Sequence, residues 1–146
     1  MKNIFTDEYF MKKALQEAEL SFEKDEIPVG AVVVINNRII AKTHNLTELL
    51  NDVTAHAEMQ AITASANFLG GKYLTNCTIY VTIEPCQMCA GALYWSQISK
   101  LVYGARDDNR GFIKMGTQLH PKTILVGGVL ENECSALMTA FFKLKR

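Results

Sequence analysis

The hydrophobic and polar positions along this chain change period several times, and each change predicts a new element. Thr6 precedes two acidic residues, which is typical of a capped helix start. Apolar side chains then recur at helical spacing as far as about Lys24, which predicts a first helix. Residues 29–35 are continuously apolar and rich in β-branched side chains, as expected of a strand buried on both faces. Residues 38–43 follow an Asn-Asn turn signal, so the two runs predict an antiparallel hairpin.

The rest of the pattern continues the alternation of helix and strand. Asp52 or Thr54 is expected to cap a second helix, which the glycine pair at 70–71 ends. A third strand over 78–83 leads to Pro85, whose missing N–H suits the first turn of a third helix. Two strands joined by a long loop and a closing helix complete the prediction, at 101–104, 123–126 and 131–146.

The order of these elements predicts an α/β protein in which helices cover both faces of one sheet. The closing helix carries apolar residues that we expect to be buried, namely Leu137, Met138, Phe141 and Phe142. No repeat, low-complexity stretch or flexible linker interrupts the chain. Residues 1–146 are therefore expected to form a single domain.

Composition excludes several classes of protein. The chain has 146 residues, 49% of them hydrophobic, and 15 Lys and Arg balance 15 Asp and Glu. Such a chain is too hydrophobic and too evenly charged to be disordered. Its neutrality also argues against a protein that coats nucleic acid indiscriminately. The apolar runs are too short to span a membrane, and the first residues lack the apolar segment of a signal peptide, so we expect a cytoplasmic protein.

The two halves of the chain nevertheless differ in charge. Residues 1–73 hold seven Lys and Arg against ten Asp and Glu, whereas residues 74–146 hold eight against five. Either the two halves simply carry differently solvated surfaces, or the second half offers a local basic surface to an anionic ligand. Its basic residues fall mainly in two stretches, Lys100, Arg106, Arg110 and Lys114, then Lys143, Lys145 and Arg146.

One constellation of residues predicts a metal site. Cys86 and Cys89 stand three positions apart at a predicted helix start, so their sulfur atoms project from nearly the same side of its first turn. A helix N-terminus also favours the thiolate form that binds metal. With His56 as a third ligand, the set suits Zn²⁺ and leaves a fourth coordination position open, as in catalytic zinc sites.

Glu58 is the candidate catalytic residue beside this set. In a regular helix two residues so spaced point roughly 200° apart, so spacing alone does not place Glu58 and His56 on one face. At an irregular helix entry both can reach one ion. There Glu58 is better suited to accept a proton from an activated water than to bind the metal.

Each of these residues also has a structural interpretation. The Cys-x-x-Cys pair occurs as a redox pair or as two buried small residues as well as in metal sites. His44 and His120 are weak candidates for a fourth ligand that would close the site. Cys77 and Cys134 have no such context and are expected to be buried free thiols.

His-x-Glu followed by Pro-Cys-x-x-Cys resembles the signature of the cytidine-deaminase-like zinc hydrolases. More closely, the chain resembles the bacterial tRNA-specific adenosine deaminases over nearly its whole length. The segments that carry this resemblance are 27–32, 44–45, 52–58, 80–86, 88–92 and 102–107. Within it, residues 104–107 and the pair Phe141 and Phe142 favour the tRNA enzymes.

The resemblance implies a three-layer α/β/α fold with a five-stranded mixed sheet, and a homodimer. It implies hydrolysis of the wobble adenosine of a tRNA anticodon to inosine, with release of ammonia. One Zn²⁺ per chain would be held by His56, Cys86 and Cys89. Glu58 would carry protons first to N1 of the flipped-out adenine and then to the leaving amine.

The resemblance also implies how the substrate is held. Asn45 would hydrogen-bond the purine, Val29 would line the base pocket, and the backbone of Ala57 and Cys86 would contact the base. By itself, Asn45 is equally interpreted as a turn residue that ends a strand. A loop that begins at Arg106 and Asp107 would contact the anticodon nucleotides. Residues 108–114 depart from the usual family pattern. Because this loop would contact the RNA, the resemblance indicates the substrate less specifically than it indicates the zinc chemistry.

Two other functions fit the same motifs. The zinc site would equally serve a deaminase of a free nucleobase or nucleoside, such as guanine, cytosine or adenosine. The free-base enzymes of this superfamily tend to seal the pocket with a C-terminal segment, where this chain shows a short basic tail that leaves room for a polymer. A zinc-stabilised binding module without catalysis is a third interpretation, against which Glu58 argues, because such a module has no need of a proton carrier.

Overall fold

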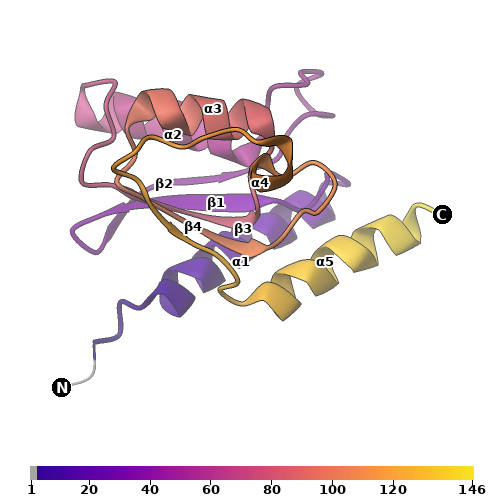
Figure 1. Ribbon diagram of the computed structural model, residues 1–146. Coiled ribbons are helices and arrows are strands. Elements are labelled where there is room, and N and C mark those ends of the chain that lie inside the picture. The colour runs from indigo at the N-terminus through magenta and orange to yellow at the C-terminus, as the bar shows by residue number, and fades with distance from the viewer. Residues whose placement is uncertain (1–2) are drawn as a thin grey trace.

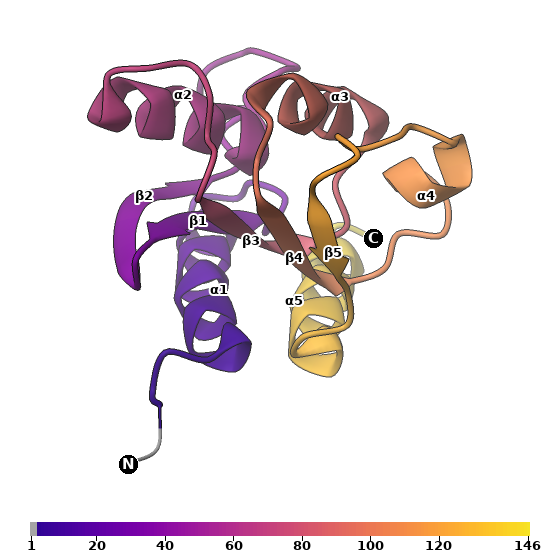
Figure 2. The same ribbon diagram turned by 60° about the vertical axis from the view of Figure 1, so that its left-hand side comes forward.

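Five strands form one mixed sheet between two layers of helices (Figure 1). The structure is a computed structural model and describes residues 3–146. Figure 2 shows α2 and α3 on one face of the sheet and α1 and α5 on the other, which confirms the predicted three-layer α/β/α fold. The elements are α1 Asp7–Glu23, β1 Gly30–Ile35, β2 Arg38–His44, α2 Ala57–Leu69, β3 Thr78–Ile83, α3 Gln87–Ser96, β4 Lys100–Ala105, α4 Phe112–Met115, β5 Ile124–Val126 and α5 Glu131–Leu144.

The strand directions bring four chain segments to one edge of the sheet. The strand order is β2-β1-β3-β4-β5, with β1 antiparallel to β2 and β3, and with β3, β4 and β5 parallel. At that edge Gly30 at the start of β1 pairs with His44 at the end of β2, and Ile83 at the end of β3 pairs with Ala105 at the end of β4. The residues that flank these four therefore lie side by side although they are far apart in sequence.

Alternate side chains of β1 pack into two separate cores. Ala31 and Val33 face the core that α2 and α3 cover, whereas Val32 and Val34 face the core that α1 and α5 cover. All four side chains are at most 5% exposed. Burial on both faces removes the polar alternation of a surface strand, which is why the sequence reads as a continuous apolar run.

The structure corrects several predicted boundaries and burials. β1 begins at Gly30, so Val29 lies just before the strand. Phe142 was expected in the core but is 42% exposed, because it lies on the side of α5 that borders a cavity, while its neighbour Phe141 is buried. Leu137 and Met138 are only half-buried. The helix α4 was not predicted, since a single turn is too short to show helical periodicity.

No helix among residues 3–146 combines the length and the apolar character needed to cross a membrane.

Thr6 caps α1 as predicted, with its hydroxyl accepting a hydrogen bond from the N–H of Tyr9. Gly70 ends α2 in the left-handed conformation, at φ 72°, which glycine adopts without the steric penalty of a side chain.

Candidate active site

Three potential metal ligands meet where α2 and α3 begin. The Nδ1 atom of His56 lies 3.7 Å from the Sγ atom of Cys86 and 3.5 Å from the Sγ atom of Cys89. All three ligand atoms lie within 4.8 Å of one another, and no other such group of His, Cys, Asp or Glu exists among the described residues. The tertiary structure thus gathers the His-Cys-Cys set from two separate helix starts.

Extended backbone at both helix starts directs these ligands toward each other. His56 is the N-cap residue of α2, at φ −71° and ψ 153°, and Cys86 is the N-cap residue of α3, at φ −72° and ψ 173°. Neither side chain caps its own helix by a hydrogen bond, so each is free to turn toward the other. The helix N-termini add partial positive charge, which favours thiolate ligands.

The predicted helix starts are therefore wrong by a few residues. Asp52 and Thr54 do not cap α2, because the carboxylate of Asp52 accepts hydrogen bonds from the N–H and the hydroxyl of Thr54, both at 2.8 Å, within the preceding loop. Pro85 does not open α3, which begins at Gln87. In both places the metal-ligand residue occupies the cap position, where a standard capping residue would otherwise be expected.

Glu58 lies in the first turn of α2 and faces the same group of ligands. The residue is 3% exposed, and its carboxyl group lies close enough to Cys89 and His56 for both to affect its pKa. His56 and Glu58 both reach Cys89 because His56 precedes the regular helix, so the angular separation of two helical residues does not apply. Burial raises the pKa of Glu58 to about 7, which suits a group that must both accept and donate a proton.

Hydrogen bonding shifts the pKa values of the two cysteines in opposite directions. A hydrogen bond from Cys89, followed in size by one from His56, lowers the pKa of Cys86 to about 4. The pKa of Cys89 is raised, chiefly because its thiol donates to Cys86 and then because it is buried. The hydrogen bond with Cys86 likewise raises the pKa of His56. These three side chains share protons that a cation would displace.

The donor set fits a zinc ion. One imidazole nitrogen and two sulfur atoms are ligands of the kind that Zn²⁺ prefers, and their number leaves one coordination position for substrate or water. Neither His44 nor His120 belongs to the ligand group, so neither closes the site. The Nδ1 atom of His44 lies 3.0 Å from Oε1 of Glu17, and the Nδ1 atom of His120 accepts the N–H of Lys122 at 3.2 Å. Cys77 and Cys134 are buried free thiols, as predicted.

A cavity of about 660 Å³ opens beside the ligand group. Its walls include every residue to which the family resemblance gave a role in substrate binding. Asn45 and Ala57 are buried in its wall, and the cavity also borders His56 and Glu58. The substrate-binding candidates that line it are Val29, Asn45, Ala57, Arg106 and Asp107.

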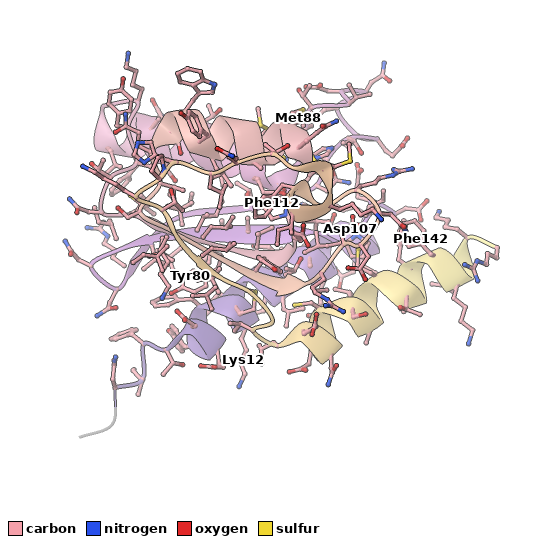
Figure 3. The ribbon with its side chains drawn as sticks, viewed as in Figure 1. Lys12, Tyr80, Met88, Asp107, Phe112 and Phe142 are labelled. Carbon is pink, nitrogen blue, oxygen red and sulfur yellow. The ribbon has the colours of Figure 1, made fainter. Side chains whose placement is uncertain are left out.

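The loop after β4 forms the exposed rim of this cavity. Asp107 folds the loop on itself, because its carboxylate accepts the N–H groups of Asn109 at 3.0 Å and Arg110 at 2.9 Å. The side chain of Arg106 is 67% exposed and lies 3.8 Å from Glu131. Figure 3 shows Asp107 and Phe142 on the same side of the molecule, where this loop faces the C-terminal half of α5.

A smaller cavity of about 340 Å³ continues along α5. It shares Ile83, Arg106, Met138 and Phe142 with the larger one, so the two cavities adjoin along these residues. Lys143 and Arg146 line its far part. These are two of the basic residues behind the positive charge of the second half of the chain.

Comparison with known proteins identifies the family. Residues 5–105 match the cytidine and deoxycytidylate deaminase zinc-binding region. A tRNA-specific adenosine deaminase of Bacillus subtilis is 43% identical over 143 residues, which cover 94% of this chain and 89% of that protein. A structure from work on A-to-I editing by tRNA:A34 deaminases at the wobble position of transfer RNA is 40% identical, with a TM-score of 0.83, and the match covers 88% of this chain and 98% of that one.

A guanine deaminase of Bacillus subtilis is also similar, at 36% identity and a TM-score of 0.68, over 77% of this chain and 71% of that one. The chain belongs to the zinc-dependent cytidine and deoxycytidylate deaminase family, within the group of tRNA-specific adenosine deaminases. The resemblance seen in the sequence is thereby confirmed.

Proposed function

We propose that this chain is a tRNA adenosine deaminase that converts the wobble adenosine of an anticodon to inosine. The observation that carries the proposal is that two cavities adjoin: the larger one borders the His-Cys-Cys group, and the smaller one is lined by the basic side chains of Lys143 and Arg146. A single base needs only the first cavity. The second offers a path for the phosphates of neighbouring nucleotides.

Glu58 would move the protons of the reaction. His56, Cys86 and Cys89 would hold the zinc ion, which would act as a Lewis acid and activate water for attack on C6 of adenine. The carboxylate of Glu58 accepts a proton from that water and delivers it to N1, so that an O–C6 bond forms without charge building up on the ring. It then takes the remaining proton from the oxygen on C6 and passes it to the exocyclic nitrogen as the C6–N bond breaks, so that the C6 carbonyl of inosine and ammonia result.

The remaining walls of the larger cavity would hold the base. Asn45 is 4% exposed and offers a side-chain amide to a purine edge, with its Nδ2 atom also 3.3 Å from the hydroxyl of Thr47. Val29 provides an apolar contact, and Ala57 and Cys86 contribute backbone at the two helix starts. A flipped-out base would thus be enclosed next to Glu58.

The direct test compares an anticodon stem-loop that contains adenosine at the wobble position with free bases and nucleosides. We expect inosine in the stem-loop and little turnover of guanine, cytosine or adenosine. Adenosine placed at another loop position is the matched control and should stay unchanged. Conversion of a free base with an unchanged stem-loop would assign the chain to the alternative function, for which the similar guanine deaminase provides the precedent.

We further propose that two copies of the chain associate through the helix layer formed by α2 and α3. Exposed aromatic side chains gather near the C-terminal ends of these helices, with Phe68 52%, Tyr73 49% and Trp95 77% exposed. Large exposed aromatic groups are typical of interfaces. Sedimentation should show a dimer that Trp95→Asp converts to a monomer.

We also place the enzyme in the cytoplasm, because tRNA is its proposed substrate and its cysteines form no disulfides.

A further inference from the structure

A buried carboxyl group links the rim loop to the metal-binding segment. Glu84 follows β3, is 4% exposed, and stands two residues before the ligand Cys86. Its Oε1 atom accepts the backbone N–H of Asp107 at 3.2 Å, and its Oε2 atom accepts that of Ile113 at 3.1 Å. Among residues 3–146, no basic side chain forms an ion pair with it. Its side chain thus binds the start of the loop after β4 and the first turn of α4.

The segment 107–113 is also held by the ring of Phe112, which is buried in the core under α2 and α3, and by a few backbone hydrogen bonds to the rest of the molecule. The N–H of Phe112 donates to the carbonyl of Pro85 at 2.9 Å, and Gly111 forms a bridge with Cys86. Most of its other hydrogen bonds lie within the loop, such as that from the N–H of Gly111 to the carbonyl of Asp107 at 3.0 Å. The segment 84–86 therefore anchors both the loop and the first ligand of α3.

Gly111 makes this arrangement sterically possible. A Cβ atom at this position would lie 2.0 Å from Oε2 of Glu84 and 2.5 Å from the carbonyl oxygen of Asp107. Any side chain here would push the carboxyl group away from the loop. The requirement for glycine comes from this close approach, since its backbone, at φ −64°, is available to any residue.

A second buried carboxyl group acts in the same way on the opposite wall of the cavity. Glu26 is 1% exposed and accepts the N–H groups of Glu48 at 2.9 Å and Leu49 at 2.7 Å. These residues follow Thr47, which lines the cavity. Glu26 has no contact with the metal-ligand segment, so it provides a matched comparison for Glu84.

We propose that Glu84 is a positioning residue that fixes the loop 107–113 for the nucleotides around the target adenosine. This inference rests on the proposed tRNA function. Glu84 makes no hydrogen bond to His56, Glu58 or Cys89, so its loss loosens the rim and leaves the proton carrier in place. The consequence is weaker stem-loop binding with nearly unchanged chemistry.

The test is Glu84→Gln, which keeps the volume of the side chain but turns an amide NH₂ toward one of the two backbone N–H groups. We expect KM for the stem-loop to rise about tenfold, with kcat within about threefold of the original. Zinc content should stay at that of the unaltered protein. Amide hydrogen exchange should become faster at Asp107 and Ile113 and stay unchanged at Glu48 and Leu49. Glu26→Gln should show the reverse exchange pattern.

A second variant reaches the same contact from the loop. Gly111→Ala should raise KM and speed exchange at Asp107 and Ile113 as Glu84→Gln does, and it keeps the test valid if the buried substitution prevents folding. Gly71→Ala is the control, because a Cβ atom there meets nothing within 4 Å.

Two outcomes would overturn the inference, and a third would refute the proposed function on which it rests. Unchanged exchange at both loop amides would show that Glu84 does not hold the loop. A fall in kcat with KM unchanged, or a loss of zinc, would show that Glu84 supports the metal centre instead. Failure of the unaltered protein to edit the stem-loop would refute the proposed function, and the exchange pattern would then still decide whether Glu84 fixes the loop.

Discussion

The two ends of the cavity are built in different ways. At the inner end Glu58 and Cys89 are almost fully buried, and the ligand positions follow from two helix starts that rest on the core. At the outer end Arg106 and Phe142 are exposed and project from a loop and a helix surface. The residues proposed for the chemical step are thus buried at the starts of two helices. The residues proposed to recognise the substrate are exposed to solvent.

This difference has an electrostatic consequence. Charges in the buried end interact through a low dielectric and are weakly screened by salt, whereas exposed basic groups are screened within about 10 Å at 0.1 M salt. Substitutions at the inner end should therefore abolish the chemical step at any salt concentration. Substitutions at the rim should change binding and its dependence on salt.

The largest effect is expected from the loss of a metal ligand. Cys89→Ser should lose zinc and all measurable deamination, and lower the melting temperature, because a hydroxyl is a poor zinc ligand and the site lies in the core. Metal analysis and thermal denaturation are the measurements. The control is Cys134→Ser, which alters an equally buried thiol outside the group and should keep zinc and activity. Full zinc content in Cys89→Ser would contradict the assignment.

Removal of the proton carrier is expected to have the next largest effect. Glu58→Gln should lower kcat by about 10²–10⁴-fold, because the amide cannot accept the proton of the attacking water. Zinc content should equal that of the unaltered protein, since Glu58 is not in the ligand group. Single-turnover kinetics on the stem-loop would measure the chemical step. Retained activity would contradict the role of Glu58 as the proton carrier.

A smaller, salt-dependent effect is expected at the basic end of the rim. Changing Lys143, Lys145 and Arg146 to Ala should weaken stem-loop binding and reduce the slope of log affinity against log salt concentration by roughly 1.5. Two phosphate contacts are lost at Lys143 and Arg146, which line the smaller cavity, whereas Lys145 is paired with Asp25. Titrations at several salt concentrations would measure both quantities, while kcat should change little.

The control for this experiment removes the same charge from another surface. A variant with three exposed lysines changed to Ala, none of which lines either cavity, should keep the original salt slope; these are Lys12, Lys42 and Lys72. Equal slopes for all three proteins would mean that the uneven charge of the two halves only reflects solvated surfaces.

The smallest effect is expected at the wall that the two cavities share. Phe142→Ala should raise KM for the stem-loop about fivefold, because an exposed ring at this place can stack on an unpaired base. Leu144→Ala is the control, since Leu144 is 73% exposed on the same helix but lines neither cavity. An equal effect of both substitutions would show that the helix end, and not the ring, contacts RNA.

The sequence predicted the fold well where the burial of one or both faces of an element sets the spacing of its apolar residues. The run in β1 indicated a strand buried on both faces, and Gly70 ended α2 as expected, because these signals are local. It misplaced both ligand-bearing helix starts. Asp and Thr are common N-cap residues, which is why Asp52 and Thr54 were predicted to cap α2. The N-cap residue is instead His56, whose imidazole ring contacts Cys89 in α3. A local rule fails where a functional side chain occupies the position.

Glu84 was missed for a related reason. An acidic residue at a strand end is unremarkable in sequence, and its partners are backbone groups more than 20 residues away. A weak signal exists in hindsight, because Glu84 stands between an apolar strand and the Pro-Cys pair, where a charged side chain has little access to water. Phe142 was misjudged because helical periodicity does not distinguish a residue facing the core from one facing a cavity.

The sequence by itself determined which chemical groups are available to this protein, since His-x-Glu and Pro-Cys-x-x-Cys supply one imidazole, one carboxyl group and two thiols. Only the tertiary structure decided that His56 meets the two cysteines, that Glu58 faces them, and that a buried carboxyl group fixes the rim loop. The reason is physical. Ligand chemistry is a property of single side chains, whereas distance between residues 30 positions apart depends on strand order and on how two helices pack against one sheet.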